Sequence, residues 1–216
     1  MNSSGIINVF VPGVKRGEEV SEYAKKMGYG EKKYFFVTSP KDGWKVFIRA
    51  CCFIHIKGKS FDPSKFVVVK TTDASPITKS WEPPKGQMEG KDGLKNPRQS
   101  LMNIMKENLQ REVEEESKIT NLKNIKHTGL VLQSKEKQYD ANTFFQYHIF
   151  QAFIDETEFD KAKSKLLWYK ENPKEWKKLR IDEREKDDID WFSPTRTKIY
   201  GRWSPSIVAL YLHNIK

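Results

Sequence analysis

The most regular pattern of hydrophobic and polar residues lies just before the middle of the chain. Hydrophobic residues recur there every four positions, at Leu101, Met105, Leu109 and Val113. This spacing is typical of a helix that buries one face, and it predicts a single long helix over residues 97–117. Asn96 is a suitable N-cap and Pro97 a suitable first-turn residue, so both support a helix start at this point.

Runs rich in β-branched and aromatic residues predict strands on both sides of this helix. Before it, residues 46–56 and 65–72 are such runs, and the short glycine-containing link between them predicts a hairpin or meander. After it, three further runs predict strands over residues 128–132, 144–153 and 189–194. A helix that opens at Ser204 and Pro205 then closes the chain.

The beginning of the chain shows a weaker pattern. Residues 5–12 and 34–37 predict strands, and residues 18–27 predict a short helix. These segments are too short to form an independent hydrophobic core. We therefore expect residues 1–45 to be an addition packed on a main domain that covers residues 46–216.

Residues 155–180 have the character of a helical insertion into that main domain. Ala162 and Leu166 lie at helical spacing, and Asn172 and Pro173 interrupt the pattern. The insertion is therefore expected to contain a helix, a break and a second short helical segment.

The same insertion is both basic and aromatic. Residues 161–180 carry eight Lys or Arg against two Glu, a local charge of +6. Lys174, Trp168 and Trp176 are of the types that neutralise phosphates and stack on bases. Buried tryptophans that hold the insertion in place are the alternative, and the sequence leaves both interpretations open.

The composition limits the class of protein. A chain of 216 residues with 37% hydrophobic residues suits one enlarged globular domain. No hydrophobic run is long enough to span a membrane, and the N-terminus lacks the pattern of a secretion signal, so we expect a cytoplasmic protein without membrane contact. The neighbouring Cys51 and Cys52 lie in a hydrophobic run and are expected to be buried free thiols of a strand.

The charge balance points towards a polyanionic partner. The formal net charge is +10, which gives a long-range positive field that a protein handling only small anions does not need. A lysine-rich surface that serves solubility is the alternative explanation.

Three carboxylates at the end of the long helix indicate candidate chemistry. Glu112, Glu115 and Glu116 stand at positions i, i+3 and i+4, so they share one helix face within roughly 6 Å. Because like charges repel, such a group favours a bound hard divalent cation. No His or Cys occurs nearby, which favours Mg²⁺ or Mn²⁺ over zinc. A solvated acidic face is the alternative.

The surrounding stretch resembles the Nudix box. That motif is a glycine, five residues, an acid, seven residues, and then Arg-Glu-apolar-any-Glu-Glu-any-Gly-apolar. Here Gly86, Asp92 and residues 111–119 supply the pieces. Asp92 replaces the usual Glu, Lys118 replaces the usual Gly, and eighteen residues precede Arg111 where the family has seven.

The extra length agrees with a longer helix. The excess of eleven residues corresponds to three helical turns of about 3.6 residues, so an N-terminal extension of the box helix keeps its faces in phase. Lys118 is the weaker match, because the family's glycine adopts a left-handed conformation that costs lysine roughly 1 kcal/mol.

The resemblance implies an α+β protein of the α/β/α Nudix fold, with a mixed sheet flanked by helices. It also implies hydrolysis of a nucleoside diphosphate linked to another group. Glu112, Glu115 and Glu116 would hold the metal and Arg111 would orient the first of them. Lys85 would contact a phosphate, and the neighbouring Gly86 would let its loop approach the helix.

A further acid outside the box often acts as base or extra ligand in this family. The resemblance to decapping members suggests Glu185, which lies six residues before Trp191 in a similar strand. The other candidates are Glu136, Asp140, Asp187 and Asp188.

The substrate stays open at this point. Residues 81–86, WEPPKG, are similar to the Trp-x-Pro-Pro-Lys-Gly of dinucleoside tetraphosphate hydrolases and to the Trp-x-Phe-Pro-Lys-Gly of mRNA decapping enzymes, and the motif alone favours the former. The long lysine-rich insertions resemble those of decapping enzymes of large DNA viruses. The net charge and the basic insertion favour capped RNA, from which m7GDP and 5′-monophosphate RNA would be released. The alternatives are a dinucleoside polyphosphate of the Ap4A type, another nucleoside diphosphate derivative, or a non-catalytic RNA-binding scaffold. The oligomeric state is not predicted.

Overall fold

The computed structural model describes residues 15–20, 32–39, 41–58, 60–72, 74, 80–94 and 98–216. The chain divides into two compact units. The first consists of Met1–Ala50, Gly86–Leu109 and Gly129–Ile149. The second consists of Cys51–Lys85, Gln110–Thr128 and Phe150–Lys216. The strand predicted over residues 5–12 and the helix start predicted at Asn96 and Pro97 lie outside the described residues.

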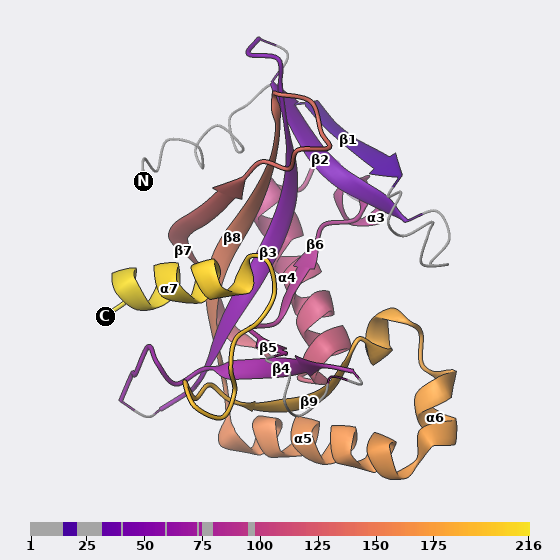
Figure 1. The fold of residues 1–216 in the computed structure, drawn as a ribbon, viewed down its shortest axis with the longest axis vertical. Helices are drawn as coiled ribbons and strands as arrows, with labels where there is room; N and C mark the ends of the chain where they lie inside the picture. The colour runs from indigo at the N-terminus through magenta and orange to yellow at the C-terminus, as the bar shows by residue number, and fades with distance from the viewer. Residues whose placement is uncertain are drawn as a thin grey trace. The chain divides into compact units, whose positions relative to one another are not determined.

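The main sheet of the first unit has six strands (Figure 1). Their order is β1 (Lys15–Val20), β2 (Lys33–Ser39), β3 (Trp44–Ile56), β8 (Thr143–Ile154) and β7 (Lys123–Ser134), with β6 (Lys85–Gln87) paired to β3. Strands β3, β7 and β8 continue along the chain into the second unit. The predicted strands over residues 34–37, 46–56, 128–132 and 144–153 are all confirmed, and β7 is longer than expected.

Side chains of β2 alternate between buried and partly exposed positions, and the buried ones contribute to the core of the first unit. Phe35 and Val37 are fully buried, whereas their neighbours along the strand are partly exposed. The short helix α3 (Gly90–Leu94) packs on β1 and β2. A Cβ atom at Gly93 would lie 2.0 Å from the Phe35 ring, so this close approach requires glycine.

A three-stranded antiparallel sheet lies in the second unit, in the order β5 (Trp81–Glu82), β4 (Val67–Thr71) and β9 (Lys186–Trp191). Helix α5 (Glu156–Glu171) runs beside β9 (Figure 1), and the rings of Phe159 and Trp191 stack with centroids 4.5 Å apart. Asn172 ends α5 and directly precedes α6 (Pro173–Lys178). The predicted helix, the break at Asn172 and Pro173 and the second short helical segment are therefore confirmed.

Helix α7 (Ser204–Asn214) is attached to the second unit through Tyr211, which is fully buried. The Tyr211 ring stacks on Phe53 with an angle of 5° between the ring planes. The Tyr211 hydroxyl lies 2.7 Å from Nε2 of His55, and Nδ1 of His55 lies 2.9 Å from the Lys65 carbonyl. Because a carbonyl can only accept, Nδ1 carries the proton and Nε2 accepts from the hydroxyl.

Acidification should therefore destabilise the protein through His55. Burial lowers the pKa of His55, so the folded state favours neutral imidazole more than the unfolded state does. The free energy of unfolding is then highest above the unfolded pKa of about 6.5 and falls as the pH drops below it. We expect urea unfolding at pH 7.5 and 5.5 to show a smaller difference in His55→Gln than in the wild type. An equal difference in both proteins would contradict this prediction.

The long helix α4 (Leu101–Ser117) begins four residues later than expected. Ser100 precedes it, and its Oγ accepts a hydrogen bond from the Asn103 backbone N–H at 3.2 Å. A serine at this position is a favourable N-cap. All four predicted stripe residues are buried: Leu101, Met105, Leu109 and Val113. The prediction that the extra residues extend the box helix is therefore confirmed, although residues 98–100, which were expected to be helical, are not.

Two other predictions were wrong. The helix expected over residues 18–27 is not formed at residues 18–20, which belong to β1 and pair with β2. The expected hairpin between β3 and β4 is also absent, because β4 pairs with β5 and β9. In the first case, pairing with β2 decided the conformation, and in the second case, pairing with β5 and β9 replaced the expected pairing with β3. The backbone hydrogen bonds of such a ladder override a weak local preference.

The α+β class predicted from the sequence is confirmed by the mixture of helices and antiparallel strands. Cys51 and Cys52 are buried free thiols in β3, as predicted. Within the described ranges, every helix is too short or too polar to cross a membrane.

Candidate active site

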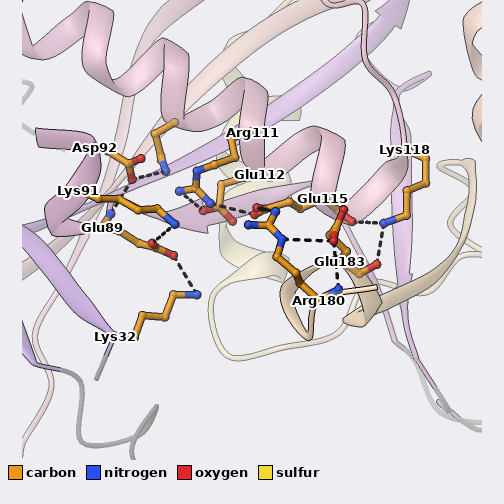
Figure 2. Close-up of polar contacts among 11 residues, drawn as sticks. Lys32, Glu89, Lys91, Asp92, Arg111, Glu112, Glu115, Lys118, Arg180 and Glu183 are labelled. Carbon is orange, nitrogen blue, oxygen red and sulfur yellow. Dashed lines mark hydrogen bonds and ion pairs between the residues drawn. The ribbon is translucent and has the colours of Figure 1, made fainter. Parts of the chain in front are cut away.

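The C-terminal half of α4 places Arg111 between two of the predicted metal ligands. Nη2 of Arg111 pairs with Oε1 of Glu112 at 2.9 Å, and Nη1 pairs with Oε2 of Glu115 at 2.9 Å (Figure 2). One planar guanidinium therefore holds both carboxylates together, as expected for the fork geometry of arginine. The predicted role of Arg111 as an orienting residue agrees with these contacts.

A second arginine reaches the same carboxylate from the insertion. Nη2 of Arg180, which follows α6, donates to Oε1 of Glu115 at 2.8 Å (Figure 2). Nε of Arg180 also donates to Oε2 of Glu183 at 3.2 Å, in the short 3₁₀ helix η1 (Asp182–Arg184). Each oxygen of the buried Glu115 carboxylate thus accepts a hydrogen bond from a different arginine.

Lys118, where the resemblance predicts a glycine, has a backbone conformation that suits the end of a helix. Its φ is +63°, which is the left-handed conformation that ends a helix. Its Nζ donates to the Glu115 carbonyl and to the Glu183 carbonyl, both at 2.6 Å, and lies 5.9 Å from the centre of the Trp176 ring. Burial lowers the pKa of Lys118 to about 8. The lysine thereby joins the end of α4 to η1.

Glu116 points to a different set of partners. Its Oε2 accepts a hydrogen bond from the Lys85 backbone N–H at 2.9 Å, and its Oε1 lies 3.6 Å from Nζ of Lys186. Burial raises the pKa of Glu116 to about 7, although Lys186 and Lys85 both act to lower it. Gly86 is predicted to let its loop approach this helix, and the neighbouring Lys85 backbone makes this contact with it.

Lys186 belongs to a buried ionic network that continues to Glu82. Nζ of Lys186 is 2.5 Å from Oε1 of Glu82, whose Oε2 accepts from Nζ of Lys85 at 2.9 Å and from Oγ of Ser204 at 2.7 Å. Desolvation acts to raise the pKa of Glu82, but the two lysines lower it overall. The second residue of WEPPKG is thus an ionised carboxylate that connects β5 to β9 and α7.

In the first unit, Asp92 stabilises local structure. Its Oδ2 accepts from the Glu89 backbone N–H at 2.9 Å and from Nδ2 of Asn108 at 3.2 Å (Figure 2). Glu89 in turn pairs with Lys32 at 3.0 Å and Lys91 at 2.6 Å. The acid that resembles the first glutamate of the box therefore ties α3 to α4.

Comparison with solved structures finds matches at low sequence identity. No family model and no curated protein matches the chain. A NUDIX hydrolase from Nitrosomonas europaea is 12% identical, with 76% of this chain and 87% of that chain covered and a TM-score of 0.41. The NUDIX domain of Shewanella oneidensis NrtR, complexed with ADP ribose, is 11% identical, with coverages of 83% and 94% and a TM-score of 0.43. A further crystal structure of a NUDIX hydrolase from Nitrosomonas europaea is 12% identical, with coverages of 94% and 89% and a TM-score of 0.39.

At these TM-scores the chemistry has to be inferred from the chain's own residues. Among the residues that the structure describes, no three or more Asp, Glu, His or Cys are grouped around one point as metal ligands. Glu112 and Glu115 share Arg111, whereas Glu116 turns to Lys85 and Lys186.

Glu112 and Glu115 nevertheless fit a hard divalent cation in their donor chemistry. Both supply carboxylate oxygens, and one guanidinium already brings them together. Arg111 and Arg180 balance their negative charge. A bound cation would supply positive charge at the same place. These two glutamates are therefore the residues that would hold Mg²⁺ or Mn²⁺ first.

The predicted acid outside the box is Glu185. Glu185 is exposed, and its backbone carbonyl accepts from the Thr72 N–H at 2.9 Å. The acid that connects to Glu115, through Arg180, is Glu183. The other candidates have ion pairs or turn contacts: Asp187 with Lys70, Asp188 with Lys170, and, in the first unit, Glu136 with Arg49 and Asp140 with the Thr143 N–H.

The aromatic residues of the insertion separate into two environments. Trp176 is partly buried and lines a cavity of about 190 Å³ together with Tyr169, Lys170 and Pro173. Trp168 is 47% exposed, and Lys174 is also exposed. Trp176 thus lies beside Lys118 and lines this cavity, so it is placed differently from the exposed Trp168.

Sequence analysis missed four charged residues of this site, namely Glu82, Arg180, Glu183 and Lys186. Arg180 is the last of the basic residues in the insertion, so its charge was counted but its individual contact was not foreseen. Glu82 stands inside the recognised WEPPKG segment. Glu183 and Lys186 carry no distinguishing local signal.

Proposed function

We propose that the chain is a metal-dependent pyrophosphohydrolase of the Nudix type. The observation that carries this proposal is the Arg111 clamp on Glu112 and Glu115, at the end of a helix whose Glu116 binds the Lys85 backbone N–H. This arrangement agrees with the Arg-Glu-x-x-Glu-Glu part of the box and with the preceding Lys-Gly. A purely solvated acidic face would not have Glu115 and Glu116 buried.

The proposed reaction adds water across a phosphoric anhydride of a nucleoside diphosphate derivative. When bound, the divalent cation neutralises pyrophosphate charge and lowers the pKa of the attacking water. Glu112 and Glu115 hold that cation, and Arg111 keeps both carboxylates in place. Lys85, whose ammonium group pairs with Glu82, supplies positive charge beside Glu116 for a phosphate.

We further propose capped RNA as the substrate and the cytoplasm as the location. The support is the net charge of +10 and the exposed lysines of the insertion, of which Lys165, Lys174 and Lys177 are examples. The products would be m7GDP and RNA with a 5′-monophosphate. A dinucleoside polyphosphate is the second candidate, because WEPPKG also resembles enzymes that act on such compounds.

Product analysis tests the function and the substrate together. The protein would be incubated with Mn²⁺ or Mg²⁺ and with cap-labelled RNA, free cap dinucleotide or diadenosine tetraphosphate. We expect release of m7GDP from capped RNA, with a rate that falls as the salt concentration rises, by roughly 0.7 logarithmic units per phosphate contact for each decade of salt. Faster cleavage of free dinucleotide than of capped RNA would contradict the decapping proposal.

Charge reversal of Lys165, Lys174 and Lys177 to Glu should weaken turnover of capped RNA and reduce its salt dependence, while dinucleotide turnover is retained. Lys163 is left unchanged because its Nζ donates to the Ile189 carbonyl at 3.0 Å. The control replaces three exposed lysines outside the insertion, Lys41, Lys57 and Lys137, by Glu. Equal effects of both triple variants would show that only net charge matters.

A further inference from the structure

The Glu115 carboxylate is neutralised by two arginines that differ in position along the chain and in exposure to solvent. Arg111 lies on the same helix, and 23% of its side chain is exposed. Arg180 comes from the insertion, and 62% of its side chain is exposed, whereas only 6% of the Glu115 side chain is exposed. A largely solvated guanidinium therefore covers one oxygen of a buried carboxylate.

The position of this guanidinium conflicts with a cation on the same oxygen. Nη2 of Arg180 lies 2.8 Å from Oε1 of Glu115, which is hydrogen-bond distance. A divalent cation held by Glu112 and Glu115 would repel it and would compete with it for the lone pairs of that carboxylate. Because the Arg180 side chain is largely solvated and the Glu115 carboxylate keeps its partner Arg111, this contact can be broken when a cation takes its place.

A second contact, with Glu183, would hold Arg180 near the site after its bond to Glu115 is broken. Its Nε donates to Oε2 of Glu183 at 3.2 Å, and the Glu183 carboxylate also accepts from the Arg180 backbone N–H at 3.1 Å. The Glu183 carbonyl is bonded in turn to Nζ of Lys118 at the end of α4. Segment 180–183 is thus attached to the box helix by a contact that does not involve the Glu115 carboxylate.

We propose that Arg180 exchanges partners when a divalent cation binds. It neutralises Glu115 in the metal-free protein, and it binds a phosphate of the substrate once a divalent cation has taken Glu115. A guanidinium suits this second role because its parallel N–H groups match two phosphate oxygens. The inference rests on the proposed function, since it requires both a metal and a phosphate-bearing substrate at the site.

The exchange predicts effects of opposite sign in Arg180→Ala. Without its competitor, Mn²⁺ should bind the substrate-free protein more tightly, by up to about fivefold, the range expected for an exposed ion pair. A substrate analogue with a methylene-bridged diphosphate should bind the Mn²⁺-saturated variant about tenfold or more weakly, because a charge-assisted hydrogen bond is lost. Calorimetric titration measures both dissociation constants without turnover.

Two further variants separate the effect of the Arg180 charge from that of its geometry and provide a control. Arg180→Lys keeps the positive charge without the planar fork, so its Mn²⁺ affinity should stay near the wild-type value while its analogue affinity falls. Lys178→Ala removes an exposed charge two residues away, which pairs with Glu175, and should change neither constant.

Weaker or unchanged Mn²⁺ binding by Arg180→Ala would show that Arg180 merely supports the Glu115 carboxylate, and it would overturn the exchange. A wild-type protein that binds no Mn²⁺ would overturn the proposed metal-dependent function and the exchange with it. Tighter Mn²⁺ binding combined with weaker analogue binding supports both.

Discussion

Replacing Glu115 by Gln should lower kcat by at least about 100-fold while the protein remains folded. Glutamine has nearly the same size as glutamate, so the packing around this buried side chain is preserved. The neutral amide cannot replace an anionic ligand of Mg²⁺ or Mn²⁺. It also leaves Arg111 without one of its two carboxylate partners. Glu112→Gln should act in the same direction, because Arg111 holds Glu112 in the same clamp.

Glu114 provides the matched control for this experiment. It lies on the same turn of α4 but is exposed, so Glu114→Gln removes the same charge without removing a proposed ligand. Its kcat should remain near the wild-type value. Initial rates at saturating substrate and metal, with circular dichroism to verify folding, measure the effect. Full activity in both Glu112→Gln and Glu115→Gln would end the assignment of a metal-dependent hydrolase.

Lys186→Met should destabilise the protein by about 3–5 kcal/mol, the cost of breaking a buried ion pair by removing one partner. Lys186 is 5% exposed, and its Nζ compensates Glu82 at 2.5 Å and Glu116 at 3.6 Å. Methionine fills a similar volume, so the loss would come from charge and not from a cavity. Urea unfolding at pH 7.5 measures the change in the free energy of unfolding.

Neutralising one of the two carboxylates left without Lys186 should then restore part of the lost free energy of unfolding. Glu82→Gln in the Lys186→Met background removes a buried negative charge and keeps a group that can still bond to Ser204. Lys170→Met is the control, because the Lys170 pair with Asp188 is 39% exposed on its lysine side and is expected to contribute at most about 1 kcal/mol. Equal losses in Lys186→Met and Lys170→Met would mean that the buried network contributes no special stability.

The elements that sequence analysis located correctly are those with a repeating local pattern. The stripe of α4 and the helix break at Asn172 and Pro173 are examples, since helix periodicity and proline geometry act within a few residues. The start of α4 was misplaced because several polar residues before Leu101 are acceptable caps, and Ser100 accepts the hydrogen bond from the Asn103 backbone N–H. Residues 18–20 were wrongly expected to be helical because their pairing with β2 is invisible locally.

Strand pairing in the second unit shows the same limit. β4 has a hydrophobic pattern that predicts a strand, but its partner β9 lies more than one hundred residues later in the chain. The pairing of distant strands depends on which surfaces the folded chain buries together, and no short window of sequence contains that information.

The sequence by itself determined that three glutamates share one face of a helix and that an arginine precedes them, because a helix fixes the direction of neighbouring side chains. Only the tertiary structure decided how these carboxylates are used. Arg180 and Lys186 reach Glu115 and Glu116 from positions about 65 to 70 residues away. Burial strengthens the electrostatic interactions between each glutamate and such distant partners. The electrostatic state of each glutamate is therefore determined by residues that local spacing cannot identify.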